Sequence, residues 1–226
     1  MDNIKKIYKS DQEEFYNSRF DDFGLIVQAD GWTSESLAHY YYERVLKLIN
    51  ISKPNSRQVD LLDIGSGHGF FYEYLKTSKL TDNFNYTGIE INENSCKKAQ
   101  EKDPGLNYIC SDFLDYDFMG LNFDFVSFIG TFSIFKSLSE LEFYDIALAN
   151  LEKAFSLADK ACILLISRFA IPNESLDKFF SEVLKISPFF DFDSTLFGDY
   201  LVLTLYKKKY VLDLYRDFKE SESKTA

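Results

Sequence analysis

Cysteine and histidine are scarce in this 226-residue chain, which has three cysteines, two histidines and no Cys-x-x-Cys pair. So few thiols exclude a disulfide framework, and so few imidazoles argue against a metal site. We therefore expect no bound metal. Cys96, Cys110 and Cys162 are expected to be buried thiols in a reducing compartment.

Positive charge is also limited, because 25 Lys and Arg face 36 Asp and Glu, for a net charge of −11. A chain this acidic is repelled by nucleic-acid phosphates and by anionic membrane surfaces. Its basic clusters are short, at Lys5-Lys6 and Lys207-Lys208-Lys209. We therefore expect neither nucleic acid nor a membrane as a partner, and favour a small-molecule substrate.

Long apolar segments are missing as well. The longest, Val126 to Phe135, is interrupted by Ser, Gly and Thr. It is far shorter than the ~20 residues that a membrane-spanning helix needs. No apolar segment follows the start at Met1 to Lys6, so no signal peptide is predicted. The expected protein is cytoplasmic, as a monomer or a homodimer.

Short apolar segments alternate with helical patterns after residue 58. Strands are expected at 59–64, 86–91, 106–110, 123–129 and 161–167. Helices are expected at 70–78, 92–101 (capped by Asn92), 138–157 (with a capping box of Ser137 and Glu140) and 174–185. A closing strand pair is expected at 189–196 and 200–206. This alternation predicts an α/β fold, a doubly wound and mostly parallel sheet with one antiparallel edge.

The two ends of the chain lack the alternation of strand and helix patterns seen after residue 58. Residues 1–32 show no clear periodicity, whereas 33–50 predict an amphipathic helix. We expect a helical cap or lid over 1–50 and a core over 51–210. The charged tail, 211–226, is expected to be a frayed helix, or disordered beyond Glu220.

The most informative motif is Asp63-Ile-Gly65-Ser66-Gly67-His68-Gly69, which follows an apolar strand and precedes a helix. Glycines there allow a tight turn and close approach of a ligand to the main chain. A dinucleotide fingerprint would place its third glycine at position 70, which is Phe. Asp63 would also oppose a pyrophosphate, so the motif favours a ligand that carries positive groups.

Two further acidic side chains end the following strands. Glu90 lies 21 residues after Gly69, where a carboxylate can accept both hydroxyls of a ribose. Asp112 and Phe113 can hold an adenine amino group and its face. Together the segments predict a site for adenine, ribose and a cationic amino-acid tail, without phosphate.

These segments, together with Tyr86 to Ile91 and Phe123 to Gly130, resemble the successive motifs of class I S-adenosylmethionine-dependent methyltransferases over about residues 57–207. The resemblance implies a Rossmann-like, seven-stranded sheet whose last strand is antiparallel. It also implies S-adenosylmethionine as the cofactor, with Asp63 and the glycine loop beside its methionine part. The expected cofactor-binding residues are Asp63, Gly65, Ser66, Gly67, Gly69, Glu90, Ile91, Asp112, Phe113 and Gly130.

The upstream segment Gly31-Trp32-Thr33-Ser34 is similar to a Gly-Trp-x-Ser segment of a bacterial small-molecule subgroup of these enzymes. That similarity implies that Trp32 and Ser34 belong to a lid over the cofactor. Candidate substrate residues are Phe23, Thr131, Phe132, Arg168 and Tyr200, from segments expected near the cleft. No donor or acceptor is predicted beside His68, which we interpret as a variable loop position.

The expected reaction is direct displacement at the sulfonium methyl group, which needs alignment and exclusion of water. No general base is identified. Three alternatives remain open: a nicotinamide-dependent oxidoreductase, a cofactor-binding protein without catalysis, and a methyltransferase for a macromolecule. Cofactor titration, turnover and a salt-sensitive pull-down, respectively, discriminate them.

Overall fold

The computed structural model describes residues 2–49, 57–132, 136–167, 176–193 and 200–225. Its helices are α1 (Asp2–Phe23), η1 (Val27–Asp30), α2 (Glu35–Ile49), α3 (Phe70–Thr77), η2 (Thr81–Asn83), α4 (Glu93–Lys102), α5 (Glu140–Leu157), α6 (Leu176–Ile186) and α7 (Lys208–Thr225). Its strands are β1 (Val59–Ile64), β2 (Phe84–Glu90), β3 (Asn107–Cys110), β4 (Phe123–Ile129), β5 (Ala158–Ser167), β6 (Phe190–Asp193) and β7 (Tyr200–Tyr206).

The seven strands form one sheet in the order β3-β2-β1-β4-β5-β7-β6. Strands β1 to β5 pair in parallel, and β7 is antiparallel to both β5 and β6. This arrangement confirms the predicted doubly wound sheet with an antiparallel last strand. The order reverses between β1 and β4, and open α/β sheets bind ligands at such a point, beyond the carboxyl ends of the strands.

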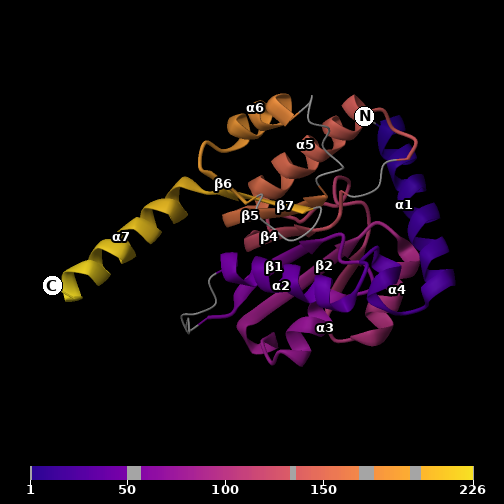
Figure 1. Ribbon diagram of the computed structural model, residues 1–226, viewed down its shortest axis with the longest axis horizontal. Coiled ribbons are helices and arrows are strands. Elements are labelled where there is room, and N and C mark those ends of the chain that lie inside the picture. The colour runs from indigo at the N-terminus through magenta and orange to yellow at the C-terminus, as the bar shows by residue number, and fades with distance from the viewer. Residues whose placement is uncertain (1, 50–56, 133–135, 168–175, 194–199, 226) are drawn as a thin grey trace.

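Helices cover both faces of the sheet (Figure 1). Side chains alternate between the faces along each strand, so Leu61 and Leu62 of β1 enter different core clusters. Leu62 packs in the cluster that contains Leu151 of α5, and Leu61 in the one that contains Tyr41 of α2. Burial on both faces explains why the parallel strands are almost continuously apolar.

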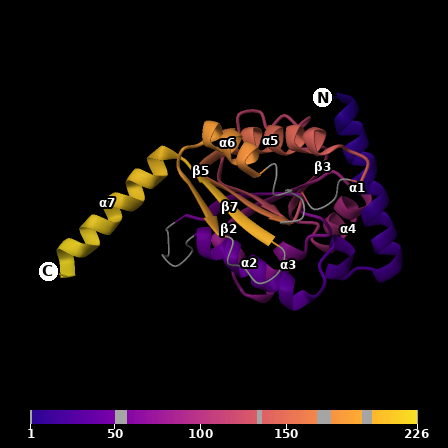
Figure 2. The same ribbon diagram turned by 45° about the horizontal axis from the view of Figure 1, so that its top comes forward.

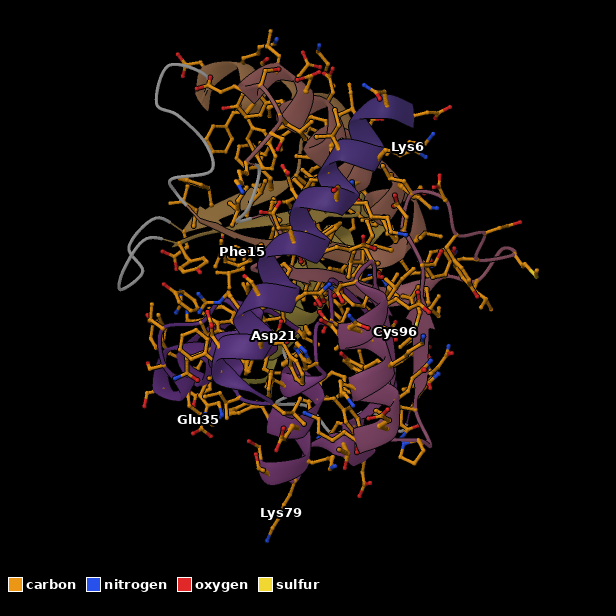
Figure 3. All side chains as sticks on the ribbon, turned by 90° about the vertical axis from the view of Figure 1, so that its right-hand side faces the viewer. Lys6, Phe15, Asp21, Glu35, Lys79 and Cys96 are labelled. Carbon is orange, nitrogen blue, oxygen red and sulfur yellow. A yellow bond between two sulfur atoms is a disulfide. The ribbon has the colours of Figure 1, made fainter. Side chains whose placement is uncertain are left out.

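Helix α1 is the largest addition to the sequence-based expectation, because a helical cap was expected over 1–50 but no individual helix was placed within residues 1–32. It extends over 22 residues and crosses in front of the sheet, beside α4 (Figure 3). Of its residues, only Tyr8, Asp11 and Gln12 are buried. Such a polar helix lacks the apolar stripe that reveals helices in a sequence.

The two predicted helix caps have different outcomes. Asn92 caps α4 as expected, since its Oδ1 accepts a hydrogen bond of 3.0 Å from the Ser95 backbone N–H. The capping box of α5 was placed two residues too early. Ser139 and Glu142 form it, because Ser139, not Ser137, is the residue that precedes the helix.

The expectation of three thiols was wrong for two of them. Cys96 in α4 and Cys110 at the end of β3 form a disulfide, with their Cα atoms 5.5 Å apart. No local pattern indicates this pairing, because the parallel β2-α4-β3 unit brings together two cysteines that are 14 residues apart. Cys162 is a buried free thiol, as predicted.

The tail of the chain is helical through Thr225, which resolves the two expectations for it. Tyr210 contacts Phe125 of β4 through its ring, at a centroid distance of 5.9 Å. Beyond this contact, α7 projects away from the rest of the protein in both views (Figures 1 and 2). None of the helices in the described ranges has the length and apolar character needed to cross a bilayer.

Candidate cofactor and active site

The glycine loop turns the chain from β1 into α3. Gly65, Gly67 and Gly69 all have positive φ angles, of 73°, 54° and 77°. The backbone N–H groups of Gly65 and Ser66 donate to the carbonyl oxygen of Ile89, at 2.8 and 3.2 Å, which joins the loop to β2. A Cβ atom at position 67 would lie 2.3 Å from Oδ2 of Asp30, so any other residue there would push the Asp30 carboxylate away from the loop.

Asp63 lies buried below this loop, at the end of β1. Its carboxylate accepts hydrogen bonds from the Tyr86 hydroxyl, at 2.7 Å, and from the Ser127 hydroxyl, at 3.2 Å. Burial raises the pKa of Asp63 to about 7, against the opposing effect of these two donors, and the charges of Glu90 and Asp30 add to the rise. A cation in the pocket would favour the ionised form of Asp63.

Glu90 ends β2 and is held by the main chain. Oε2 accepts from the Gly67 N–H at 2.8 Å, and Oε1 accepts from the Asn92 N–H at 2.7 Å. Burial raises the pKa of Glu90 to about 7, although both N–H donors oppose this rise. Each carboxylate oxygen has a second lone pair, so Glu90 can also accept from ligand hydroxyls.

The segments after β3 and β4 complete the sheet side of the pocket. Asp112 turns the chain after β3, and its Oδ1 accepts from the Leu114 N–H at 2.8 Å. Thr131 donates to the Ile64 carbonyl at 2.7 Å and thereby joins the β4 loop to the glycine loop. The pocket lining from these segments includes Ser111, Asp112, Phe113, Gly130, Thr131 and Phe132.

The opposite side of the pocket comes from the N-terminal segment. Helix α1 contributes side chains at helical spacing, and η1 and the turn after it contribute two more; they are Lys5, Tyr8, Gln12, Tyr16, Asp30 and Trp32. Sequence reasoning found only Trp32 among them. The spacing of residues 5, 8, 12 and 16 was the available signal, but polar and aromatic side chains obscured it.

The two sides enclose about 950 Å³ of unfilled space, the mouth included. Four carboxyl groups line it, from Asp30, Asp63, Glu90 and Asp112. Among the described lining residues, Lys5 is the one cation, and it pairs with Asp115. The pocket therefore favours a ligand with positive charge.

Most predicted cofactor residues meet in this pocket. Asp63, Gly65, Ser66, Gly67, Glu90, Ile91, Asp112, Phe113, Gly130 and Trp32 all line it, as do the substrate candidates Thr131 and Phe132. Gly69 is not part of the lining and instead packs against Tyr108 at the start of α3.

Other candidates lie elsewhere. The Ser34 hydroxyl accepts from the Leu37 N–H at 3.2 Å, at the start of α2. Phe23 is exposed at the end of α1, under the Arg19 guanidinium. Tyr200 stacks on Trp32, behind the pocket wall, at 5.6 Å between ring centroids. Arg168 lies outside the described residues.

The expectation that no donor or acceptor lies beside His68 was wrong. Its Nδ1 pairs with Oδ1 of Asp30, and its backbone N–H donates to Oδ2 of Asp30 at 3.1 Å. Asp30 is 38 residues away in the chain, so no local pattern indicates this contact. Within the described ranges, no group of three or more His, Cys, Asp or Glu side chains is arranged to hold a metal ion.

Comparison with known proteins finds a methyltransferase domain within the chain. Residues 62–146 match the family model of a methyltransferase domain, and they include the glycine loop, Glu90 and Asp112. A comparison with curated proteins finds no match. The chain is similar in fold to magnesium protoporphyrin IX methyltransferase from Synechocystis PCC 6803 with bound SAH (S-adenosylhomocysteine). The TM-score is 0.61, with 17% identity over 88% of this chain and 99% of that one.

Two further solved structures share the fold. One is a TehB-like SAM-dependent methyltransferase from Corynebacterium glutamicum, with a TM-score of 0.52 and 16% identity over 77% of this chain and 100% of that one. The other is the plantazolicin methyltransferase BpumL with SAH, with a TM-score of 0.56 and 14% identity over 91% and 98%.

Residues 62–146 thus match a methyltransferase domain, and the sheet order belongs to a fold that S-adenosylmethionine-dependent methyltransferases share. The Synechocystis enzyme has also been solved with bound SAM (S-adenosylmethionine). The pocket fits S-adenosylmethionine in one respect: the buried Ser66 hydroxyl in its wall has no hydrogen-bond partner in the protein and is free to bind a ligand. The cofactor supplies a methyl group on a positively charged sulfur.

Proposed function

We propose that the pocket between the sheet and α1 binds S-adenosylmethionine and that the methyl group passes directly to a small-molecule acceptor. The observation that carries this proposal is the placement of Glu90. Its carboxylate is buried, lines the pocket, and is oriented by the N–H groups of Gly67 and Asn92. In the proposed complex Glu90 accepts from the ribose hydroxyls.

The other parts of the cofactor are assigned by position. The glycine loop, above the buried Asp63, would hold the methionine part. Asp112 and Phe113, beyond β3, would hold adenine through a carboxylate and an aromatic face. Residues 1–50 would act as the lid, because α1 and η1 supply the opposite wall. This lid excludes water from the sulfonium centre.

The acceptor is proposed to be small and either neutral or cationic. Four carboxyl groups in the lining and a net charge of −11 disfavour a polyanion. Two structural neighbours are methyltransferases named for magnesium protoporphyrin IX and for plantazolicin, neither of which is a nucleic acid. Thr131 and Phe132, after β4, are the proposed acceptor-side residues, with alignment and desolvation as their contribution. We also propose that the protein acts in the cytoplasm.

Calorimetric titration with S-adenosylmethionine, S-adenosylhomocysteine and NADH tests the site. We expect the first two to bind and NADH not to bind, because a carboxylate-lined pocket opposes a pyrophosphate. Binding of NADH alone would overturn the proposal. If both adenosyl ligands bind, acceptors of different charge can be screened by S-adenosylhomocysteine release. Failure of a broad panel of neutral and cationic acceptors would then favour a binding protein without catalysis.

A further inference from the structure

Asp30 reaches the glycine loop from the N-terminal segment. It is the last residue of η1, and Gly31, in the left-handed conformation, turns the chain away immediately after it. Oδ2 accepts from the His68 N–H at 3.1 Å, while Oδ1 pairs with Nδ1 of the same histidine. Both carboxylate oxygens therefore contact one residue of the glycine loop.

The histidine that holds Asp30 is itself fixed. His68 is 1% exposed, and its ring stacks on Phe20 of α1 with 5.2 Å between centroids and 12° between planes. Neighbouring Gly67 has no side chain, and this lets the carboxylate of Asp30 lie against the loop. Asp30 thus has a defined position between the lid and the loop.

That position is at the pocket surface. The Asp30 side chain is 14% exposed and lines the pocket together with Asp63 and Glu90. Its charge acts on both of those carboxyl groups, so the three lie within one electrostatic environment. Three acidic groups around one loop repel each other, and a cationic ligand group among them would relieve this repulsion.

We propose that Asp30 binds the amino group of the cofactor's methionine part, and that His68 is a positioning residue that aims the Asp30 carboxylate. The proposal rests on the proposed function, because it assumes that the methionine part lies at the glycine loop. Asp63 is less suited to this contact, since it is almost completely buried and already accepts from Tyr86 and Ser127. The lid would then close onto the cofactor through a charged contact of its own.

The test compares two ligands in the intact protein by calorimetry. S-adenosylhomocysteine carries the amino-acid part, whereas 5′-methylthioadenosine has the same adenine, ribose and thioether sulfur without it. Asp30→Asn keeps the shape of the side chain and removes its charge. We expect it to weaken S-adenosylhomocysteine binding about 10- to 100-fold and to leave methylthioadenosine binding nearly unchanged.

His68→Gln should shift the ratio of the two affinities in the same direction by a smaller factor. Asp11→Asn is the matched control, because Asp11 joins α1 to Ser137 without lining the pocket. It should change both affinities equally. Equal losses of both ligands in Asp30→Asn, no loss, or tighter binding of S-adenosylhomocysteine would each overturn the proposal. If neither ligand binds to the wild-type protein, the cofactor assignment itself fails.

Discussion

The two walls of the pocket are built in different ways. The sheet wall is held by the main chain: the strands pair, the Ile89 carbonyl accepts two N–H groups of the glycine loop, and Glu90 accepts two more. The lid wall is held mainly by side chains. Its described polar contacts with the core include Lys5–Asp115, Asp11–Ser137, Asn17–Asn92 and Asp30–His68.

Because of this difference, the sheet wall can hold its carboxylates in fixed positions while the lid wall can open to admit ligands. Main-chain hydrogen bonds in a sheet break only when the sheet unfolds, so they keep the carboxylates of the sheet wall in place. Each side-chain contact of the lid contributes only about 0.5–1.5 kcal/mol net, or somewhat more where charged. The lid is therefore the wall that can open at the lower free-energy cost, which admits ligands without disturbing the sheet wall.

The largest effect is expected from a substitution that makes the glycine loop of the sheet wall clash with Asp30 of the lid wall. Gly67→Ala places a Cβ atom 2.3 Å from Oδ2 of Asp30 at a φ angle of 54°. We expect S-adenosylmethionine binding to fall more than about 100-fold in calorimetry, because Asp30 and the lid are displaced from the loop and a side chain at this positive φ strains the loop backbone. Gly120→Ala is the control, since its φ is 78° but nothing lies within 4 Å of the added atom. Equal cofactor affinity in both variants would contradict this assignment.

The sheet wall contains the Cys96–Cys110 disulfide, which a single substitution removes. Cys110→Ser opens the disulfide that ties α4 to β3 across 14 residues, and the exposed position 110 accommodates a hydroxyl. We expect the free energy of unfolding to fall by about 3 kcal/mol in oxidised protein. Urea denaturation with and without a reducing agent measures this, and the reductant should have no comparable effect on the variant. A reductant-independent wild type would show that the bridge contributes nothing.

Removal of the Glu90 carboxylate tests the proposed contact between the sheet wall and the ribose. Glu90→Ala should weaken S-adenosylmethionine binding by about 1–3 kcal/mol, since charge-assisted hydrogen bonds to the ligand are lost. Tyr42→Phe provides a control that changes a lining side chain without changing its charge. Isothermal titration gives both affinities. Unchanged binding in Glu90→Ala would place the ribose elsewhere in the pocket.

The smallest expected effect is the dependence on pH. Asp63 and Glu90 have pKa values raised to about 7, so the folded protein binds more protons than the unfolded chain between about pH 4 and pH 7. Their contribution to stability therefore decreases as pH rises through that range. A cationic ligand favours the ionised forms, so we expect affinity to increase about tenfold from pH 6 to pH 8. Titrations at several pH values measure it; a flat profile, or one that Glu90→Gln leaves unchanged, would refute it.

The sequence predicted the sheet wall well. The bounds of β1, β4 and β7 agree with the structure, because apolar segments between polar turns show clearly when both faces of a strand are buried. Asn92 was identified from the local preference for capping residues. The capping box at Ser139 was missed by two residues, since neighbouring serines and glutamates compete for the same role.

Errors concentrate where contacts are distant in the chain. The disulfide of Cys96 and Cys110 depends on how α4 packs beside β3, and helix α1 depends on a surface that exists only after the sheet has formed. Ser34 was expected in the lid because of the Gly-Trp-x-Ser similarity, and Phe23 was a substrate candidate because its segment was expected near the cleft. In the structure Ser34 caps α2, and Phe23 lies under Arg19.

The class of fold, the glycine loop and the three acidic strand ends can be predicted from the sequence, because strand periodicity, turn chemistry and spacing are local properties. Which side chains face them depends on tertiary packing. Asp30 meets His68 and α1 closes over Glu90 through side-chain contacts between segments far apart in the chain. Such contacts follow from packing and charge in three dimensions, and no local pattern encodes them.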